Sequence, residues 1–140
     1  MMEPIRLSYT VPGDDFTHAG HASSDLKKKL KLMGIDPEKI RNVAISLYEG
    51  EINLCIHGGG GTIDALIYPD RVEMYLDDEG PGIPDISLAM KEGWSGASAE
   101  VRSLGFGAGM GMPNMKKYTD EMTVTSEVGK GTHIKLVVNL

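Results

Sequence analysis

Glycine is concentrated at a few places in this chain. Of its 18 glycines, 12 stand in four short clusters: at 58–61, at 80 and 82, at alternate positions from 105 to 111, and at 129 and 131. Glycine loses more backbone entropy on folding than any other residue, so clusters inside a folded domain require either tight turns or a ligand that approaches the backbone closely. Composition alone leaves both explanations open.

The length and charge of the chain limit the classes of protein it can belong to. A chain of 140 residues with 41% hydrophobic and 24% charged residues is typical of one globular domain, here 1–140. No apolar run is long enough to cross a membrane, the first residues lack a signal-peptide pattern, and the single cysteine, Cys55, is expected to be a small core residue. A net charge of −6 argues against non-specific nucleic-acid binding. We therefore expect a cytoplasmic domain with no membrane or nucleic-acid partner.

Hydrophobic periodicity and turn residues predict the order β-α-α-β-β-α-α-β-β. Strands are expected at 5–11, 62–68, 72–76, 122–126 and 132–138, and helices at about 15–33, 36–57, 86–92 and 109–118. This order predicts an α/β fold, a two-layer sandwich in which helices cover one face of a mixed, mostly antiparallel sheet.

Local signals predict where the two long helices begin and end. The segment 13–15, Gly-Asp-Asp, offers an N-cap for the first helix, and Gly34 is placed to end it. Asp36 followed by Pro37 predicts the start of the second helix, because proline is favoured at the first helical position. This second helix is expected to stop in the glycine cluster at 58–61, for which no function is predicted.

The second helix carries a narrow polar strip between two apolar sides. On a helical wheel the strip contains Asn42, Ser46, Glu49, Asn53 and His57. Glu49 and Asn53 are four residues apart and project side by side, so they could activate a hydroxyl and hold a hard cation such as Mg²⁺. The alternative is a polar ridge that satisfies loop backbone. The wheel places Glu51 in a position that fits neither interpretation.

Three further motifs could bind a nucleotide. Asp78 follows a predicted strand and is followed by Gly80 and Gly82, so its carboxylate could accept the exocyclic amine of an adenine. The run at 105–111 opens a helix whose backbone N–H groups could bind phosphates. Simpler explanations are a turn with solvated acids for the first motif and a hinge for the second. The third, the segment 129–132, is more often an ordinary hairpin turn.

Well-known nucleotide signatures are missing from the sequence. It contains no Gly-x4-Gly-Lys-[Ser/Thr] loop, and the alternating glycines at 105–111 do not match Gly-x-Gly-x-x-Gly. It also lacks the His-Arg-Asp and Asp-Phe-Gly motifs of eukaryotic-type protein kinases.

Taken together, the four motifs resemble the N, G1, G2 and G3 boxes of the GHKL ATPase superfamily, which includes gyrase, MutL, a heat-shock chaperone ATPase and the histidine kinases. The motifs follow one another in that order over 49–132, and the resemblance covers nearly the whole chain. No segment remains for a phosphoacceptor-histidine domain, which argues against an ordinary histidine kinase. The sequence from 80 to 86 and from 107 to 113 is most similar to the bacterial anti-sigma-factor serine kinases, in particular the switch kinases of stress-response partner switching.

This resemblance implies a Bergerat fold and an ATP-dependent serine/threonine protein kinase. The enzyme would phosphorylate a STAS-type anti-sigma antagonist, with Mg²⁺ as cofactor. Glu49 would be the general base, Asn53 would bind Mg²⁺ at the ATP phosphates, and Asp78 would bind the adenine, with Thr132 supporting Asp78 or the base.

The remaining candidate nucleotide contacts follow from the same resemblance. The phosphate-binding glycines would be Gly105, Gly107, Gly109 and Gly111, and the segment 93–104 would be the ATP lid. Arg102 or Lys116 could steady the γ-phosphate, although either could be a plain surface charge. The other candidate contacts are Gly80, Gly82, Ile83 and Met112.

Some residues depart from the family pattern or leave alternatives open. Gly50 stands where the family usually has an aliphatic residue or alanine after the Glu, and Leu54 stands where it usually has alanine after the Asn. Gly50 weakens the helix by up to ~1 kcal/mol and could give a partner room near Glu49. His18 and His21 are not favoured as a metal pair, and His57 is expected to make a polar contact at the helix end.

Two other functions remain open at this stage. One is a nucleotide-gated anti-sigma factor that sequesters a sigma factor or phosphatase with little catalysis. The other is an ATPase subunit of a sensor kinase. A homodimer is also compatible with the sequence.

Overall fold

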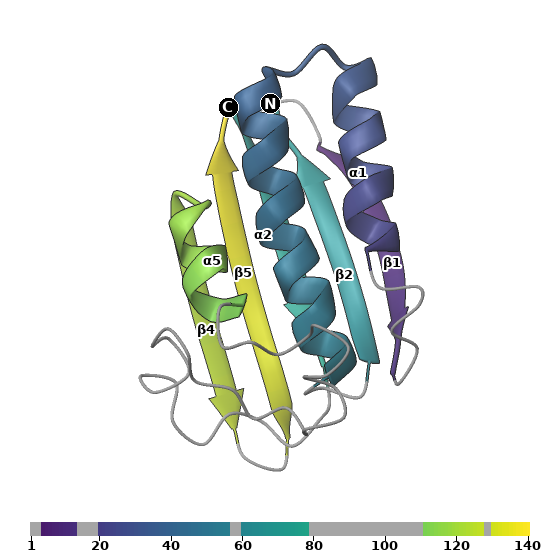
Figure 1. The fold of residues 1–140 in the computed structure, drawn as a ribbon, viewed down its shortest axis with the longest axis vertical. Coiled ribbons are helices and arrows are strands. Elements are labelled where there is room, and N and C mark those ends of the chain that lie inside the picture. Colours follow the sequence, from purple (N-terminus) through teal and green to yellow (C-terminus); the bar gives the residue numbers. More distant parts are fainter. Residues whose placement is uncertain (1–3, 14–19, 57–59, 79–110, 128–129) are drawn as a thin grey trace.

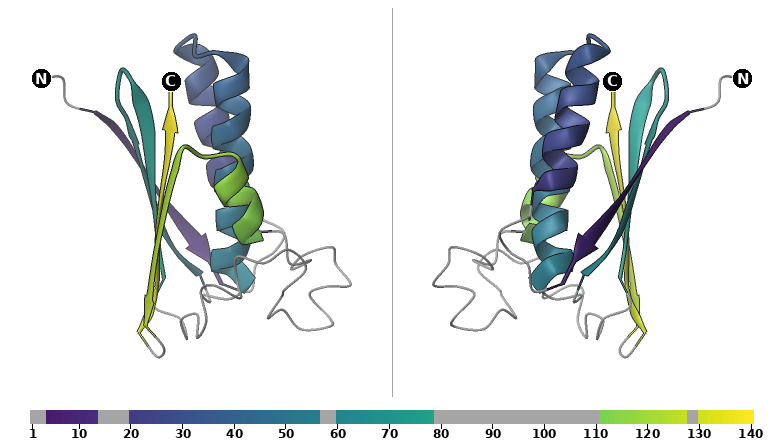
Figure 2. Two further views of the ribbon diagram at one scale, coloured as in Figure 1. Left: turned by 90° about the vertical axis from the view of Figure 1, so that its left-hand side faces the viewer. Right: turned by 90° about the vertical axis from the view of Figure 1, so that its right-hand side faces the viewer.

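A computed structural model describes residues 4–13, 20–56, 60–78, 111–127 and 130–140. Within these ranges the chain forms two layers, a sheet and a group of helices that covers one of its faces (Figures 1 and 2). The predicted two-layer α/β sandwich is therefore confirmed. The predicted helix at 86–92 and the predicted lid at 93–104 lie outside the described residues.

The described residues form a sheet of five strands in the order β1-β2-β3-β5-β4. Each of these strands is antiparallel to its neighbours, so this part of the sheet is not mixed as predicted. The strands are β1 (Ile5–Pro12), β2 (Gly60–Ile67), β3 (Arg71–Asp77), β4 (Glu121–Glu127) and β5 (Gly131–Asn139). The predicted hairpin between β2 and β3 is confirmed, and the Tyr68 N–H donates to the Arg71 carbonyl at 2.8 Å. The register pairs Asp77 with both Thr62 and His133, so the end of β3 lies between the starts of β2 and β5.

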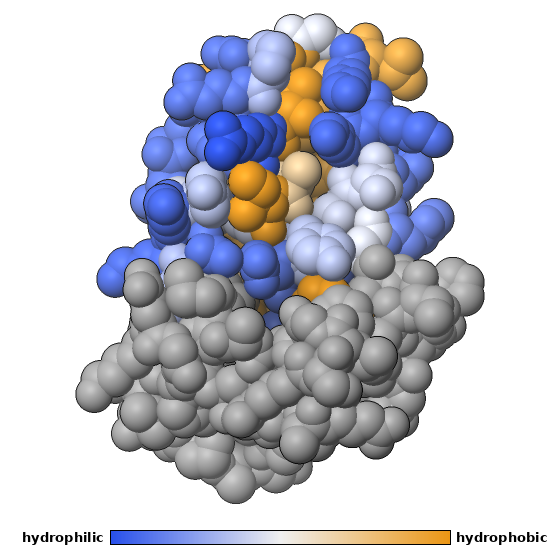
Figure 3. Space-filling model, viewed as in Figure 1, coloured by the Kyte–Doolittle hydropathy of each residue, from blue (hydrophilic) through white to orange (hydrophobic). Residues whose placement is uncertain are grey.

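The helical layer consists of α1 (His21–Leu32), α2 (Pro37–Ile56) and the short α5 (Gly111–Lys117). Figure 1 shows α2 in the middle of the layer, with α1 on one side and α5 on the other. The start of α2 is as predicted: the Glu38 N–H donates to the Asp36 carboxylate at 3.1 Å. The outer surface of the two long helices is mainly hydrophilic, with apolar residues exposed between them (Figure 3).

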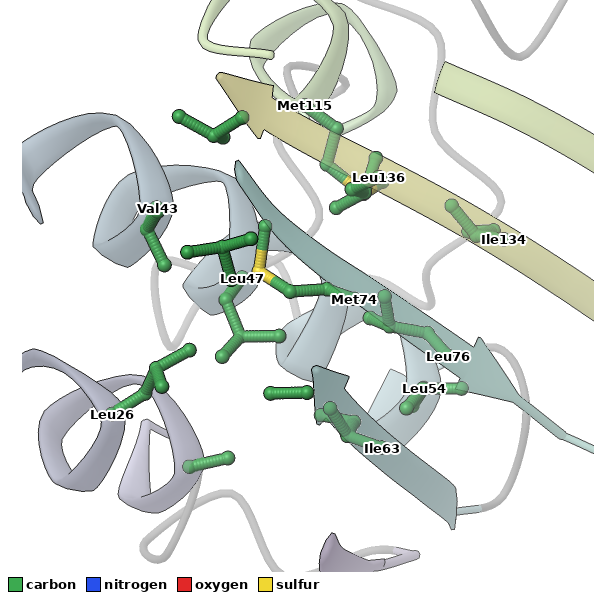
Figure 4. Packing of buried hydrophobic residues seen from close by; sticks show 14 of the residues in the cluster. Leu26, Val43, Leu47, Leu54, Ile63, Met74, Leu76, Met115, Ile134 and Leu136 are labelled. Carbon is green, nitrogen blue, oxygen red and sulfur yellow. The ribbon is translucent and has the colours of Figure 1, made fainter. Parts of the chain in front are cut away.

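The core lies between α2 and the central strands. Fully buried Val43, Leu47 and Leu54 of α2 belong to one cluster with Met74 and Leu76 of β3. Figure 4 shows these side chains converging, with Leu26 of α1 and Met115 of α5 at the two sides of the cluster. Burying one such side chain contributes ~2 kcal/mol, so the core fixes α2 firmly on the sheet.

Gly50 allows α2 to approach β3 closely. A Cβ atom at this position would overlap the Leu76 side chain and would lie 3.5 Å from the Met115 sulfur. The expectation that Gly50 gives a partner room near Glu49 is therefore wrong, because core side chains fill that space. Glycine is needed here because α2 packs closely on β3, and it does not leave space for a partner.

The predicted N-cap of α1 at 13–15 is also wrong. The helix begins at His21, directly after Gly20, whose φ of +100° is left-handed and cannot continue a helix. Asp14 and Asp15 lie outside the described residues. The predicted end of α1 is confirmed, with Gly34 at a φ of +73°.

A carboxylate from α2 performs the capping that Gly20 cannot. Glu51 is only 1% exposed, and its Oε2 accepts from the backbone N–H groups of Gly20 at 3.0 Å and Ala22 at 3.1 Å. Its Oε1 accepts from the Ser23 N–H at 2.7 Å. A negative charge is favourable at a helix N-terminus, where N–H groups lack helical partners. This contact explains the position of Glu51 on the helical wheel.

We predict that Glu51→Gln lowers the free energy of unfolding by about 2 kcal/mol and Glu51→Ala by about 3 kcal/mol, because buried N–H groups lose a charged acceptor. Urea denaturation measures the effect, and Glu121→Gln on the exposed edge of the sheet is the matched control. A Glu51→Gln midpoint equal to that of the control variant would contradict the capping role.

Candidate functional site

Glu49 lies where α2 meets α5. Its carboxylate is half-buried, and the Asn114 side-chain N–H donates to its Oε1 at 3.2 Å. Asn114 belongs to α5, so this hydrogen bond joins two helices that lie 65 residues apart in the sequence. Asn53, also half-buried, follows one helical turn later on α2, as the sequence predicts.

The other members of the predicted polar strip do not all share this environment. Ser46 is completely buried, and its hydroxyl donates to the Asn42 carbonyl at 2.7 Å. Its polar group is thus satisfied by the backbone of its own helix, which is a structural role. Asn42 is half-buried and His57 lies outside the described residues. Within the described ranges, Glu49 is the member of the strip that hydrogen-bonds to a side chain of another element.

Asp78 is held at the end of β3 by Thr132 of β5. Its backbone N–H donates to the Thr132 carbonyl at 3.0 Å, and its Oδ1 accepts from the Thr132 N–H at 3.1 Å. The two residues are only 6% and 4% exposed. The Thr132 hydroxyl lies 3.0 Å from the Ser126 hydroxyl of β4. The structure therefore brings Asp78 and Thr132 together, as the resemblance implied.

Both parts of the candidate site lie at the same end of the molecule. Figure 1 shows the C-terminal half of α2 and the start of β5 at that end, together with the start of α5, and the register places the end of β3 beside the start of β5. This arrangement follows from the antiparallel register, which places Asp77 opposite the start of β5. Residues separated by about 80 positions in the sequence can thus serve one ligand.

The remaining candidate residues are only partly described. Gly111 is the first residue of α5, and Met112 is 5% exposed and belongs to the hydrophobic core. Lys116 is exposed in the last turn of α5, about 8 Å along the helix axis from Gly111. The candidates outside the described residues are Gly80, Gly82, Ile83, Arg102, Gly105, Gly107 and Gly109. The roles of all these residues toward a nucleotide remain predictions.

A magnesium site built from few protein ligands fits this arrangement. The described residues contain no group of three or more His, Cys, Asp or Glu side chains that could hold a metal ion. Mg²⁺ usually binds one or two protein oxygens and completes its shell with waters and substrate phosphates. Glu49 and Asn53, one helical turn apart on α2, offer oxygens of the kind that such a site uses. His21 instead packs edge-on against the Tyr9 ring, with centroids 6.5 Å apart.

Two polar residues that matter here were missed at the sequence level. Asn114 stands in a short helix among methionines and lysines, and nothing in the sequence pairs it with Glu49. The helical wheel showed only that Glu51 lies outside the polar strip. Its capping role could not be predicted, because its partners are backbone N–H groups at the start of another helix. In both cases the contact joins distant segments, which periodicity cannot reveal.

Membrane insertion through a helix finds no support in the described part of the chain. None of its helices combines the length and the apolar character that a membrane span requires.

Comparison with known proteins identifies the family of this chain. The family model described as histidine kinase-, DNA gyrase B- and HSP90-like ATPase matches residues 34–140. The serine/threonine-protein kinase RsbT of Bacillus subtilis (strain 168) is 28% identical over 127 residues, which cover 88% of this chain and 87% of that protein. An anti-sigma F factor of Thermoanaerobacter sp. (strain X514) is 35% identical over 109 residues, 73% of each chain.

Solved structures show the same fold. The SiaB–SiaC complex from Pseudomonas aeruginosa matches with a TM-score of 0.64 and 11% identity, over 97% of this chain and 90% of that chain. The RsbU and RsbW domains of Rv1364c from Mycobacterium tuberculosis match with a TM-score of 0.62 and 15% identity, over 98% of this chain and 32% of that chain. At these identities the likeness concerns the fold alone.

The family model and the two relatives confirm the resemblance predicted from the four motifs. The predicted class of function, a serine/threonine kinase of the anti-sigma regulatory type, is the class that the names of these relatives describe. This chain therefore belongs to the histidine kinase-, DNA gyrase B- and HSP90-like ATPase family.

Proposed function

We propose that this chain is an ATP-dependent serine/threonine protein kinase of the anti-sigma regulatory type, formed by a single ATPase domain over residues 1–140. Its substrate would be a STAS-type antagonist protein in a partner-switching system. The observation that carries this proposal is Glu49, a carboxylate oriented by Asn114 at the same end of the molecule as Asp78. The kinase RsbT, similar over 88% of this chain, supports it.

Glu49 would act as general base toward the protein substrate. As the serine or threonine oxygen attacks the γ-phosphorus of ATP, the carboxylate takes the hydroxyl proton, and ADP leaves with the electron pair of the broken bond. The Asn114 N–H fixes Oε1, so that Oε2 can face the hydroxyl.

The other residues would hold the nucleotide. Mg²⁺, when bound, would neutralise charge on the phosphates during transfer. The Asn53 side-chain oxygen would hold it, and the Asp78 carboxylate would accept the adenine amine while Thr132 keeps the aspartate in place. Phosphoryl transfer depends mainly on such positioning and charge stabilisation.

A second candidate is a nucleotide-gated anti-sigma factor that binds a sigma factor with little catalysis. It is favoured by the anti-sigma F factors, at 35% identity, which exceeds the 28% identity of the kinase RsbT. Nucleotide binding is common to both candidates, so phosphate transfer separates them. Nucleotide binding by the wild type without transfer to any of several STAS-type proteins would favour the second candidate.

We predict that Glu49→Gln reduces transfer of radiolabelled phosphate to a STAS-type substrate by about 10²–10⁴-fold, because the general base is lost. ATP binding should persist in this variant. Glu38→Gln, in the exposed first turn of the same helix, is the matched control. Label transfer that survives in Glu49→Gln would remove the assignment of the base.

We predict that Asp78→Asn weakens ATP binding by about 10–100-fold, the effect of losing a hydrogen bond to a buried charged acceptor. Asp77→Asn is the control, because the neighbouring Asp77 is half-exposed and pairs with His133 at 2.7 Å. Isothermal titration calorimetry with and without Mg²⁺ measures the affinities. Equal ATP affinity in Asp78→Asn and wild type would argue against this nucleotide site.

We predict that Asn114→Ala lowers kcat about tenfold while the KM for ATP is unchanged, because Glu49 loses its orientation. In Asn114→Asp a second carboxylate would face Glu49 and disfavour its ionised form. The acid limb of the kcat–pH profile should therefore move to higher pH. Lys117→Ala, in the same helix, is the control, and an unshifted profile in Asn114→Asp would exclude a positioning role for Asn114.

A further inference from the structure

A groove runs between α1 and α2 on the outer surface of the helical layer. We call it the α1–α2 groove and define its floor by four apolar residues: Ile35, Ile40, Ala44 and Ile45. Its volume is about 500 Å³. Figure 3 shows a band of apolar residues between the two helices, with hydrophilic residues on both sides. The floor is continuous with the core through Ile40, which is 4% exposed.

Three cations line the rim of the groove. Lys27 and Lys31 project from α1, one helical turn apart, and Arg41 projects from α2. All three are exposed, and none of them forms an ion pair within the described part of the chain. None of the described residues that line the groove is acidic.

This concentration of positive charge runs against the charge of the protein as a whole. The segment 27–41 contains six of the 14 lysines and arginines and only two acids, in a chain whose net charge is −6. Cations needed only for solubility would be interspersed with acids, as they are elsewhere in this chain. The local charge therefore selects an acidic partner.

We propose that the α1–α2 groove is the docking surface for an acidic amphipathic helix of the protein substrate. Aliphatic side chains on one face of that helix would fill the floor, and carboxylates on its flanks would pair with Lys27, Lys31 and Arg41. A helix laid in an apolar groove presents its anchors at helical spacing. The identity of the partner as substrate rests on the proposed function, whereas the groove and its charge do not.

The groove lies along the same helix as the candidate catalytic residue. Ile45 stands one helical turn before Glu49 on α2, and Arg41 lies about 12 Å from Glu49 along the helix axis. Tyr48, which is 40% exposed, extends the same side of α2 beyond the groove. A substrate docked by one helix in the groove would therefore have a second segment within reach of Glu49.

Two other occupants fit the groove less well. In a two-fold symmetric dimer built on this face, the same cationic rim would meet itself, and like charges would repel. A membrane surface offers anionic charge but is flat, whereas the apolar floor is recessed between two helices. A protein segment matches both the concave shape and the charge.

The binding test uses a fluorescein-labelled 18-residue helical peptide with leucines on one face and glutamates on both flanks. We expect the triple variant Lys27→Glu/Lys31→Glu/Arg41→Glu to bind it at least about tenfold more weakly than wild type by fluorescence anisotropy. The control variant, Lys28→Glu/Lys39→Glu/Lys117→Glu, has the same net charge and should bind like wild type. A peptide with lysines in place of the glutamates should bind the triple variant more tightly than the wild type. Equal affinity of wild type and triple variant for the acidic peptide would overturn the proposal.

Two further measurements identify other occupants. Sedimentation that shows a wild-type dimer dissociated by the triple variant, without peptide binding, would overturn the proposal in favour of a second copy. Binding to phosphatidylserine vesicles that the triple variant loses, again without peptide binding, would overturn it in favour of a membrane surface.

Kinetics separate failure of this inference from failure of the proposed function. With a STAS-type substrate, the triple variant should raise the KM for the protein about tenfold and leave kcat and ATP affinity unchanged. An unchanged KM in an active enzyme would overturn the docking site and leave the kinase assignment intact. Charge-dependent peptide binding by a protein that transfers no phosphate would overturn the kinase assignment and leave the docking site intact.

Discussion

The contact on which the rest of the helical layer depends is the one between Glu51 and the start of α1. Gly20 has no side chain to cap the helix, and the buried carboxylate from α2 accepts three backbone N–H groups instead. This contact fixes α1 against α2 at the end opposite the connecting loop, so the two helices cannot slide along each other. Glu49 and Glu51 are two residues apart and therefore project about 200° apart, so Glu51 points to α1 while Glu49 points to α5. The same turn of α2 therefore holds the helical layer together and carries the candidate base.

Close packing of α2 on the sheet determines how the two halves of the candidate site meet. Gly50 lets the helix lie against Leu76 and Met115, and the antiparallel register then places the end of β3 beside the start of β5. A side chain at position 50 would require the buried Leu76 side chain to shift. Part of the glycine excess thus has a structural cause that is independent of ligand: a Cβ at Gly61 would overlap the Asp77 carbonyl. Close packing thus accounts for Gly50 and Gly61, whereas the approach of a ligand to the other glycine clusters stays a prediction.

The sequence predicted those features that depend on neighbouring residues. The β2–β3 hairpin and the start of α2 at Asp36-Pro37 were predicted correctly, because turn and cap signals act over a few residues. The start of α1 was predicted wrongly because its cap comes from Glu51, about 30 residues further along the chain. Ser46 was grouped with Glu49 because a helical wheel shows which way a side chain projects but not what it contacts. In the structure the Ser46 side chain is completely buried. The Glu49–Asn114 contact depends on how α5 docks, which no local pattern specifies.

The three sides of α2 suggest how recognition and chemistry could be combined in so small a fold. One side, with Val43, Leu47 and Leu54, is buried against the sheet. A second contains Glu49 and Asn53, and a third, with Arg41, Ala44 and Ile45, faces the α1–α2 groove. Because a rigid helix carries all three, a partner held in the groove has a fixed position relative to Glu49, without any separate substrate-binding domain. Since the acids of this chain outnumber its cations, the cations that line this groove would also direct an acidic partner to it rather than to the rest of the surface.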